Sequence, residues 1–428
     1  VLLVVFCSLF FTHTLYEVNV TNADEASFFN FIGDHLNLDI WRHGTPNRSG
    51  IVLVPKYIKK YFENELSVAG IKYEIEVENI KEMLDLEDRL MASVPNKFLS
   101  FNRTKLKDEL FDRIYNYIND YLEDVAKSYP DTVSLVNAGK SFEGRDIKYL
   151  RISSTKFQDT DKPIIFMQSL LHAREWITLP VTLYAIHKLV VDVPDKDMAQ
   201  DVDWIILPIA NPDGYEYTHN KFRLWRKNRS TGNSIGNICV GVDLNRNFDV
   251  NWSIASSKIP CSETYHGQSF FSEPETAVIR DIITEYGSRI ELFFDIHSFG
   301  SLLLYGYGTG ELPENSQILQ TVGERIAETI DTFKMSWNPN YSVGNVAQIL
   351  YKASGSAQDY ALAVGVPLSY TIELPGYRYG LGTGLGFLVD PSFIEQAGME
   401  TWEGIRVGAK FVLDNFRLRK EIYSAMGL

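Results

Sequence analysis

His172 and Glu175, a histidine and a glutamate three residues apart, have the chemistry to hold a metal ion. They follow the apolar run Ile164–Leu171 and precede the apolar, helix-compatible stretch Ile177–Val190. Imidazole nitrogen and carboxylate oxygen both suit zinc, and a catalytic zinc site takes three protein ligands and leaves one position open for water. The third ligand must therefore come from elsewhere in the chain.

Two more candidate residues follow apolar runs that are typical of buried strands. His297 comes directly after Glu291–Ile296, and Glu373 directly after Leu368–Ile372. Open α/β sheets bind their ligands at the carboxyl ends of the strands, so we expect these residues to meet the first pair at one edge. Taken alone, a histidine such as His297 on a buried strand is more often a hydrogen-bonded core residue than a metal ligand. Joined to the first pair, it becomes the expected third zinc ligand.

The remaining candidates are charged or amide side chains, each with a functional and a structural interpretation. Glu373 is expected either in a buried ion pair with an arginine or as a general base that takes a proton from the attacking water. The basic run Arg223–Arg229 is either a solvated face or a source of one cation, Arg226, that stabilises an oxyanion. Asn245 and Arg246 together suit the binding of a carboxylate.

Length and charge limit the classes of protein to consider. A chain of 428 residues exceeds one typical hydrophobic core, which predicts two units of unequal size. The apolar content of 45% and the aromatic content of 13% are those of a packed globule. A formal net charge of −14 argues against nucleic acid or an anionic membrane as the main partner.

The N-terminal stretch Val1–Phe11 is apolar but too short to span a bilayer, and it is typical of part of a secretory signal peptide. The alternative is a buried N-terminal strand. Export would remove Cys7 and leave Cys239 and Cys261, which favours one disulfide over two free thiols.

The sequence also contains Asn-x-Ser/Thr sequons, which permit glycosylation. They begin at Asn19, Asn47, Asn102, Asn228, Asn251 and Asn340.

The elements that follow predict a small α+β unit of the ferredoxin-like type, with the order β-α-β-β-α-β. Alternating or apolar runs predict strands at 15–20, 38–42, 51–54 and 71–77, and amphipathic stretches predict helices at 24–37, where Asp24 is the expected cap, and at 56–69. The charged, partly helical stretch 78–103 carries Arg89, Lys97 and Arg103, which a trypsin-like protease would recognise.

From about Leu106 onward the sequence alternates apolar strand-like runs with amphipathic helices, which predicts an α/β sandwich whose strands are covered on both faces. The clearest predicted strands are 148–152, 164–170, 204–210, 291–296 and 368–372, and the last predicted helix is 391–418.

Taken together, the motifs resemble those of the zinc metallocarboxypeptidases of the A/B digestive type, family M14. The residues that carry this resemblance lie at 172–176, 211–214, 223–226, 243–247, 260–267, 296–298 and 351–355, and the match covers nearly the whole chain. It implies a catalytic domain, 106–428, with a mixed eight-stranded sheet between helices. It also implies an activation domain at 15–92, a connecting segment cut on activation at 93–105, and a signal-peptide remnant at 1–14.

The resemblance also implies a role for each candidate residue. His172, Glu175 and His297 would bind one Zn²⁺. Glu373 would be the general base and later the proton donor to the leaving amine, and Arg226 would polarise the scissile carbonyl. The substrate contacts that it implies are Asn245 and Arg246 on the terminal carboxylate, Tyr351 closing over it, and Arg174 in neighbouring subsites.

Side-chain specificity depends on Gln358, which the resemblance places on the floor of the specificity pocket. Members that cut after Lys or Arg carry Asp there, and members that prefer aliphatic or aromatic ends carry an apolar residue. The implied walls have no charge; they are Leu304, Val346, Ala353 and Thr371. We therefore expect release of uncharged residues, with polar Gln or Glu ends permitted, because burying an unpaired ammonium is costly.

Other classes of hydrolase carry motifs that this sequence lacks. A serine hydrolase would need Gly-x-Ser-x-Gly and a helical zincin His-Glu-x-x-His, and neither occurs. An inactive peptide-binding relative, a Lys/Arg- or glutamate-preferring enzyme and a regulatory prohormone-type carboxypeptidase are the alternatives within the family. We expect a secreted monomer, in a digestive lumen, whose partners are peptide and protein C-termini, an activating trypsin-like protease and proteinaceous carboxypeptidase inhibitors.

Overall fold

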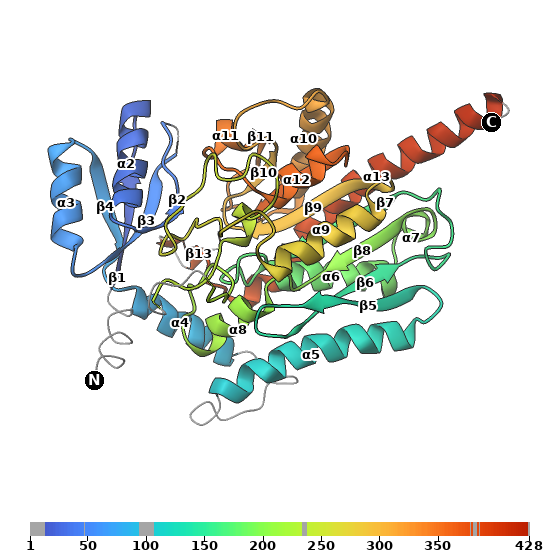
Figure 1. Cartoon of the computed structure of the whole chain (residues 1–428), viewed down its shortest axis with the longest axis horizontal. Helices are drawn as coiled ribbons and strands as arrows, with labels where there is room; N and C mark the ends of the chain where they lie inside the picture. Colours follow the sequence, from blue (N-terminus) through green and yellow to red (C-terminus); the bar gives the residue numbers. More distant parts are fainter. Residues whose placement is uncertain are drawn as a thin grey trace. The chain divides into compact units, whose positions relative to one another are not determined.

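The computed structural model describes the backbone of residues 13–46, 48–93, 107–232, 238–376, 378–379, 383–384 and 386–426. The chain divides into two compact units (Figure 1). The smaller contains the elements from β1 to α4 together with Cys261–Glu263 and the segment 377–391, and the larger contains most of the remainder. Val1–Phe11 and, beyond Ser93, the predicted connecting segment lie outside the described residues.

The smaller unit has the predicted β-α-β-β-α-β order, followed by a third helix. Its strands are β1 (His13–Asn19), β2 (Asp39–Arg42), β3 (Gly50–Pro55) and β4 (Lys72–Val77), and its helices are α2 (Ala23–His35), α3 (Lys59–Val68) and α4 (Ile80–Ser93). The strands form an antiparallel sheet in the order β2-β3-β1-β4. A short antiparallel pair, β13 (Arg378–Tyr379) and β14 (Thr383–Gly384), completes it.

Two local predictions in this unit need correction. The cap of α2 is Asn22 and not Asp24, because the Asn22 side chain accepts the backbone N–H of Glu25 at 2.9 Å. The predicted helix at 56–69 begins three residues later, because a turn in which Ile58 N–H donates to Pro55 O precedes α3.

A mixed eight-stranded sheet forms the centre of the larger unit, as expected, in the order β11-β10-β12-β9-β7-β8-β6-β5. Its strands are β5 (Val133–Lys140), β6 (Asp146–Ile152), β7 (Ile164–Ser169), β8 (Asp203–Leu207), β9 (Ile290–Ser298), β10 (Leu302–Tyr305), β11 (Ser342–Asn345) and β12 (Leu368–Leu374). The central strands β12, β9, β7 and β8 run parallel to their neighbours in this series. Every residue of β7 and β8 is buried, which confirms the expected cover on both faces.

Helices form the outer layers of this unit (Figure 1). They are α5 (Lys107–Ser128), α6 (Thr178–Val190), α7 (Lys196–Asp201), α8 (Pro212–Asn220), α9 (Pro274–Tyr286), α10 (Ser316–Phe333), α11 (Val346–Ile349), α12 (Ala357–Ala363) and α13 (Ile394–Met426), with 3-10 turns at Leu244–Arg246 and Pro391–Phe393. Helices α9 and α12 pack on one face of the sheet, around Phe166 and Phe293. Helices α6 and α10 each pack against α13, and the three form the other layer.

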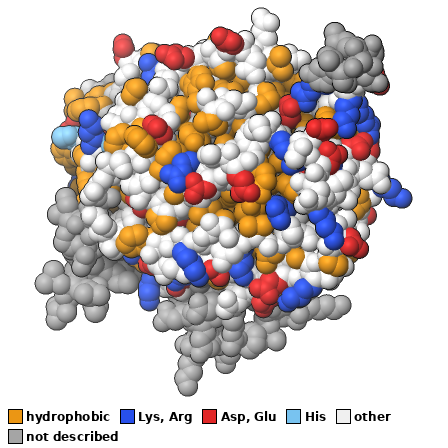
Figure 2. Space-filling model, turned by 45° about the vertical axis from the view of Figure 1, so that its right-hand side comes forward, with side chains coloured by type: hydrophobic (Ala, Val, Ile, Leu, Met, Phe, Trp, Pro, Cys, Tyr) orange, Lys and Arg blue, Asp and Glu red, His pale blue; other side chains and the backbone are white. Residues whose placement is uncertain are grey.

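The charges on the surface and the composition of the helices are relevant to two partners that the sequence argues against, nucleic acid and membranes. On the face drawn in Figure 2, Lys and Arg side chains are interspersed with Asp and Glu and do not gather into a basic patch. None of the described helices combines the length and the apolar composition needed to cross a membrane.

Candidate metal centre and active site

His172 and Glu175 lie in the tight connection between β7 and α6. The backbone of this connection is fixed from a distant loop, because Ala173 N–H donates to Arg226 O at 3.0 Å. His297 lies near the end of β9, the parallel neighbour of β7. The strand ends therefore bring the two segments together at one edge of the sheet, as the sequence predicts.

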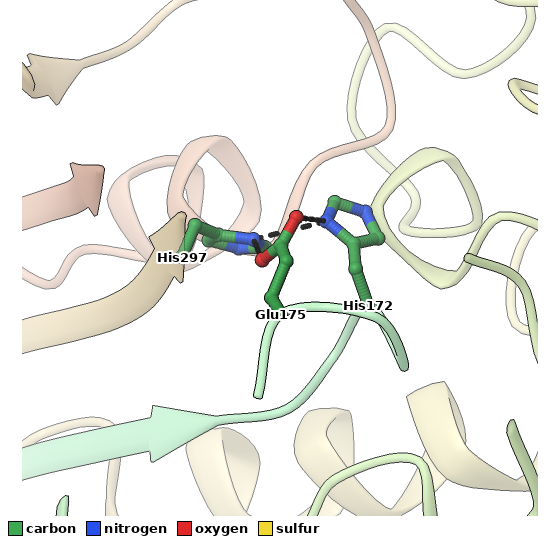
Figure 3. A group of neighbouring side chains, drawn as sticks. All are labelled: His172, Glu175 and His297. Atoms are coloured by element: carbon green, nitrogen blue, oxygen red, sulfur yellow. Dashed lines mark hydrogen bonds and ion pairs between the residues drawn. The ribbon is translucent and has the colours of Figure 1, made fainter. Parts of the chain in front are cut away.

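The three side chains converge on one point (Figure 3). The two Glu175 oxygens lie 2.9 Å from His172 Nδ1 and 2.9 Å from His297 Nδ1, and the two Nδ1 atoms lie 3.0 Å apart. All three residues are buried. Two imidazole nitrogens and a carboxylate at this spacing are a suitable donor set for a catalytic zinc ion.

Each histidine has an aspartate at its other ring nitrogen, and neither aspartate was among the site residues predicted from the sequence. His172 Nε2 lies 3.0 Å from Asp243 Oδ1, and His297 Nε2 lies 2.8 Å from Asp295 Oδ2. Carboxylates in this position fix the tautomer and orientation of zinc-binding histidines, so Nδ1 is the atom left for the metal. The supporting role of Asp295 could have been predicted from the sequence, because Asp295 lies two residues before His297 on the same strand and therefore projects from the same face.

Electrostatics favour the charged forms of these carboxylates. Burial alone would raise the pKa of Glu175, but His172 and His297 lower it below its ordinary value. Burial acts in the same way on Asp243, and Arg226 and His172 hold its pKa well below the ordinary value. Ionised carboxylates are the form that binds a cation and orients histidines, so the residues present fit a zinc ion.

Glu373 lies beside the metal donors through strand pairing. It is the direct partner of His297 across the parallel strands β12 and β9, and of Leu302 on β10. Paired residues on parallel strands project from the same face of the sheet. The half-buried Glu373 carboxylate therefore emerges at the edge where the three donors meet.

Arg226 is anchored by the aspartate that orients His172. Its Nε and Nη2 lie 3.1 and 2.9 Å from Asp243 Oδ2, and its side chain is 12% exposed. The neighbouring Arg223 and Arg229 lie over the rings of Trp176 and Tyr217, each at 3.7 Å. This basic run is therefore not a solvated face, and Arg226 presents a fixed cation close to the donors.

Asn245, Arg246 and Tyr351 form a second cluster on the same side. Arg246 Nη2 donates to the Tyr351 hydroxyl at 2.8 Å, and Asn245 Nδ2 lies 3.4 Å from His297 Nε2. The Asn245 amide oxygen accepts the N–H of Ala357 at 2.8 Å. An amide, a guanidinium and a phenol are thus grouped next to the donors, which is an arrangement that can bind a carboxylate.

Two other predicted residues are buried. Arg174 is 2% exposed, and its Nη1 donates to Leu224 O at 3.3 Å. Gln358 is also 2% exposed and lies in the first turn of α12. Of its predicted walls, Leu304, Val346 and Ala353 belong to one apolar cluster. Thr371 is the strand partner of Leu304.

The family is decided by comparison with known proteins. A model of the zinc carboxypeptidase family matches residues 118–404. The chain belongs to the zinc carboxypeptidase family. A model of the carboxypeptidase activation peptide matches residues 16–87, so this zinc carboxypeptidase carries the expected activation domain. The resemblance stated from the sequence is confirmed, and a serine hydrolase or a helical zincin is excluded.

Two carboxypeptidases match over nearly the full length of the chain, and a third relative matches over a shorter part. Carboxypeptidase B of Helicoverpa zea is 44% identical over 408 residues, which cover 94% of each chain. The crystal structure of carboxypeptidase A from Helicoverpa armigera matches with a TM-score of 0.90 and 53% identity, and covers 95% of this chain and 98% of that one. Bovine thrombin-activatable fibrinolysis inhibitor, solved in complex with tick carboxypeptidase inhibitor, is 29% identical over 70% of this chain and 97% of its own, with a TM-score of 0.63.

The expected disulfide of this zinc carboxypeptidase is also confirmed, because Cys239 and Cys261 are both disulfide-bonded.

The predicted glycosylation sequon at Asn228 begins at a residue that is not accessible. Asn228 is fully buried, and its Nδ2 donates to Glu273 and Glu275 at 2.7 and 3.1 Å. A folded chain therefore has no room for a glycan at this asparagine.

Proposed function

We propose that this chain is a zymogen whose mature form removes one uncharged residue at a time from the C-termini of peptides and proteins. The observation that carries the proposal is the grouping of three metal donors, Glu373 and the Asn245–Arg246–Tyr351 cluster at one sheet edge. A carboxylate-binding cluster beside the reacting centre accepts a chain terminus and excludes an internal peptide bond.

Each residue then has a defined task. His172, Glu175 and His297 would hold a zinc ion, which would supply a Lewis acid for the scissile carbonyl and for the attacking water. Glu373 takes a proton from the attacking water and returns it to the leaving amine. Arg226, fixed by Asp243, stabilises the oxyanion as it develops.

The substrate is held by the remaining predicted residues. Arg246 and Asn245 bind the terminal carboxylate, and Tyr351 closes over it. Arg174 supports the neighbouring subsites through its contact with the Leu224 carbonyl.

Gln358 makes the specificity pocket neutral. The relatives described above are named carboxypeptidase A and carboxypeptidase B, so their names alone leave both preferences open. A pocket with an amide instead of a carboxylate on its floor gives a C-terminal Lys or Arg no direct partner for its charge, and burial of an unpaired charge is costly. We therefore infer preference for aliphatic, aromatic and uncharged polar residues over Lys and Arg.

Activation requires a cut in the segment 93–105, where Lys97 and Arg103 suit a trypsin-like protease. We also propose that the protein is secreted, that it acts in digestion, and that it is active as a monomer. Proteinaceous inhibitors are proposed as partners because a 29% identical relative has been solved with a tick carboxypeptidase inhibitor.

The test is hydrolysis of peptides ending in Phe, Leu, Glu, Gln and Lys, before and after trypsin, with and without a zinc chelator. Release should appear only after trypsin, stop with the chelator, and be slowest for Lys. If the trypsin-treated, zinc-loaded protein releases no residue from any peptide, the carboxypeptidase activity is refuted. If Lys is released fastest, the neutral-pocket inference is refuted.

A further inference from the structure

The side-chain amide of Gln358 is held in one orientation by the next residue in the chain. Gln358 Nε2 donates to Asp359 Oδ1 at 2.8 Å, and both residues are buried in the first turn of α12. The Gln358 main-chain oxygen is fixed separately, because Ser369 Oγ donates to it at 2.7 Å.

Asp359 is itself immobilised by the chain that follows β10. Its Oδ2 accepts the backbone N–H of Gly308 at 2.8 Å. Two glycines allow this approach: a Cβ on Gly306 would lie 2.2 Å from Asp359 Oδ1, and one on Gly308 would lie 3.3 Å from Oδ2. Both carboxylate oxygens therefore accept hydrogen bonds, one from a main-chain donor and one from Gln358, and the Ser356 side chain also donates to this carboxylate.

Burial raises the pKa of Asp359 to about 6, so above this pH its carboxylate only accepts hydrogen bonds, and the group that Gln358 turns toward it must be its NH₂. The opposite orientation would place two acceptor oxygens against each other in a buried site. The Gln358 carbonyl oxygen Oε1 then points away from Asp359, and no group in the described part of the chain donates to it. This oxygen is therefore available as an acceptor for a donor on the substrate.

We propose that Asp359 is a positioning residue that makes the specificity pocket present a hydrogen-bond acceptor, so that released residues with a carboxamide side chain, Gln and Asn, are preferred over Glu and Asp. The inference rests on the proposed function and on the pocket position of Gln358. The apolar cluster of Leu304, Val346 and Ala353 would accommodate the methylene groups, and Oε1 would accept the N–H of the substrate amide.

Glutamine and glutamate ends have almost the same shape, so their ratio isolates the hydrogen-bond polarity of the pocket. A carboxylate end would place its oxygens against Gln358 Oε1 and leave both acceptors unsatisfied. We expect the trypsin-activated wild type to release Gln faster than Glu by about tenfold in kcat/KM.

Asp359→Asn tests the positioning role. Asparagine offers one acceptor oxygen, which the main-chain N–H of Gly308 retains, so its NH₂ faces Gln358. The Gln358 amide must then turn over and present its NH₂ to the substrate. The Gln-to-Glu ratio, with each rate normalised to release of Leu by the same variant, should fall about tenfold or more. Ser369→Ala is the matched control, because it removes a contact with the Gln358 main chain and should leave the ratio unchanged.

Gln358→Met covers the case in which Asp359→Asn does not fold. Methionine keeps the length of the side chain without the amide, so the Gln-to-Glu ratio should again fall. An unchanged ratio in either active variant, or a wild type that releases Leu but shows no preference for Gln over Glu, overturns this inference and leaves the proposed function intact. A wild type that releases neither Leu nor any other residue refutes the proposed function, and this inference with it.

Discussion

His297 and Glu373 are direct partners on the adjacent parallel strands β9 and β12. The loop that follows β9 passes close to the same point, since a Cβ on Gly300 would lie 3.1 Å from Glu373 Cβ. The separation between a metal donor and the proposed base is therefore set by the backbone register of two buried strands. A one-residue slip of either strand would turn one of the two side chains to the opposite face of the sheet.

Glu373→Gln should abolish most activity and leave the metal in place. An amide keeps the shape of the carboxylate but cannot accept the proton of the attacking water, so kcat should fall by about 100-fold to 10,000-fold. Zinc content, measured by atomic absorption, should remain that of the wild type. Loss of zinc together with activity would show that Glu373 supports the metal site and is not the base.

Asp243→Asn should weaken zinc binding. The substitution removes the charge that orients His172 and anchors Arg226, and loss of such a supporting carboxylate typically costs about 10- to 100-fold in metal affinity. Competition with a chelator measures the affinity directly. Asp249→Asn, at an exposed position on the same segment, is the control, and equal zinc affinity in both variants would contradict the role given to Asp243.

Arg246→Ala should impair binding of the substrate terminus. A hydrogen bond to a charged group is worth about 1.5 to 3 kcal/mol, so kcat/KM should fall by about 10- to 100-fold, chiefly through KM. Lys352→Ala, which removes an exposed cation next to Tyr351, should change KM little. The assignment of Arg246 to the terminal carboxylate fails if the two variants have the same KM.

The stability of the larger unit should fall as the pH rises toward neutrality, in part because of Glu275. Burial raises the pKa of this carboxyl to about 7. A group with a raised pKa stabilises the folded state fully below its unfolded pKa of about 4.3, and this contribution is lost as the pH rises through about 7.

Glu275→Gln should flatten this dependence, because glutamine does not titrate. The free energy of unfolding, from denaturant titrations at pH 5 and pH 8, should fall less in this variant than in the wild type, by up to about 3 kcal/mol. Glu285→Gln, exposed on the same helix, should follow the wild type. Parallel curves for all three proteins would contradict the raised pKa.

The parts of the fold that could be predicted from sequence are those with a local signal. Strands β7, β9 and β12 are apolar runs, so their ends, and with them His172, His297 and Glu373, could be located before any coordinates. Strands β5, β10 and β11 were not among the strands predicted: β5 lies at the edge of the sheet and is only partly buried, and β10 and β11 have four residues each and no polar-apolar alternation. A strand so short is defined by its neighbours in the sheet more than by its own pattern.

The supporting residues depended on tertiary contacts. Asp243 lies 71 residues from His172, and only the folded chain brings its carboxylate to the imidazole. The hydrogen bond from Gln358 to Asp359 joins adjacent residues. The orientation of the Asp359 carboxylate, however, is fixed by the main-chain N–H of Gly308, which lies 51 residues away and donates to the other oxygen. Sequence spacing indicates which residues do chemistry more readily than which residues hold them in place.

The distance along the chain between the metal donors has a consequence for how the protein acquires its metal. His297 follows Glu175 by 122 residues, so a chain in which β7 has formed but β9 has not docked offers zinc only the nearby pair. A site that lacks one of its three donors holds zinc far more weakly, and closing so long a loop costs entropy that the metal alone does not supply. We therefore expect zinc uptake to be a late step that follows assembly of the central strands, so that the metal stabilises a fold that has already formed.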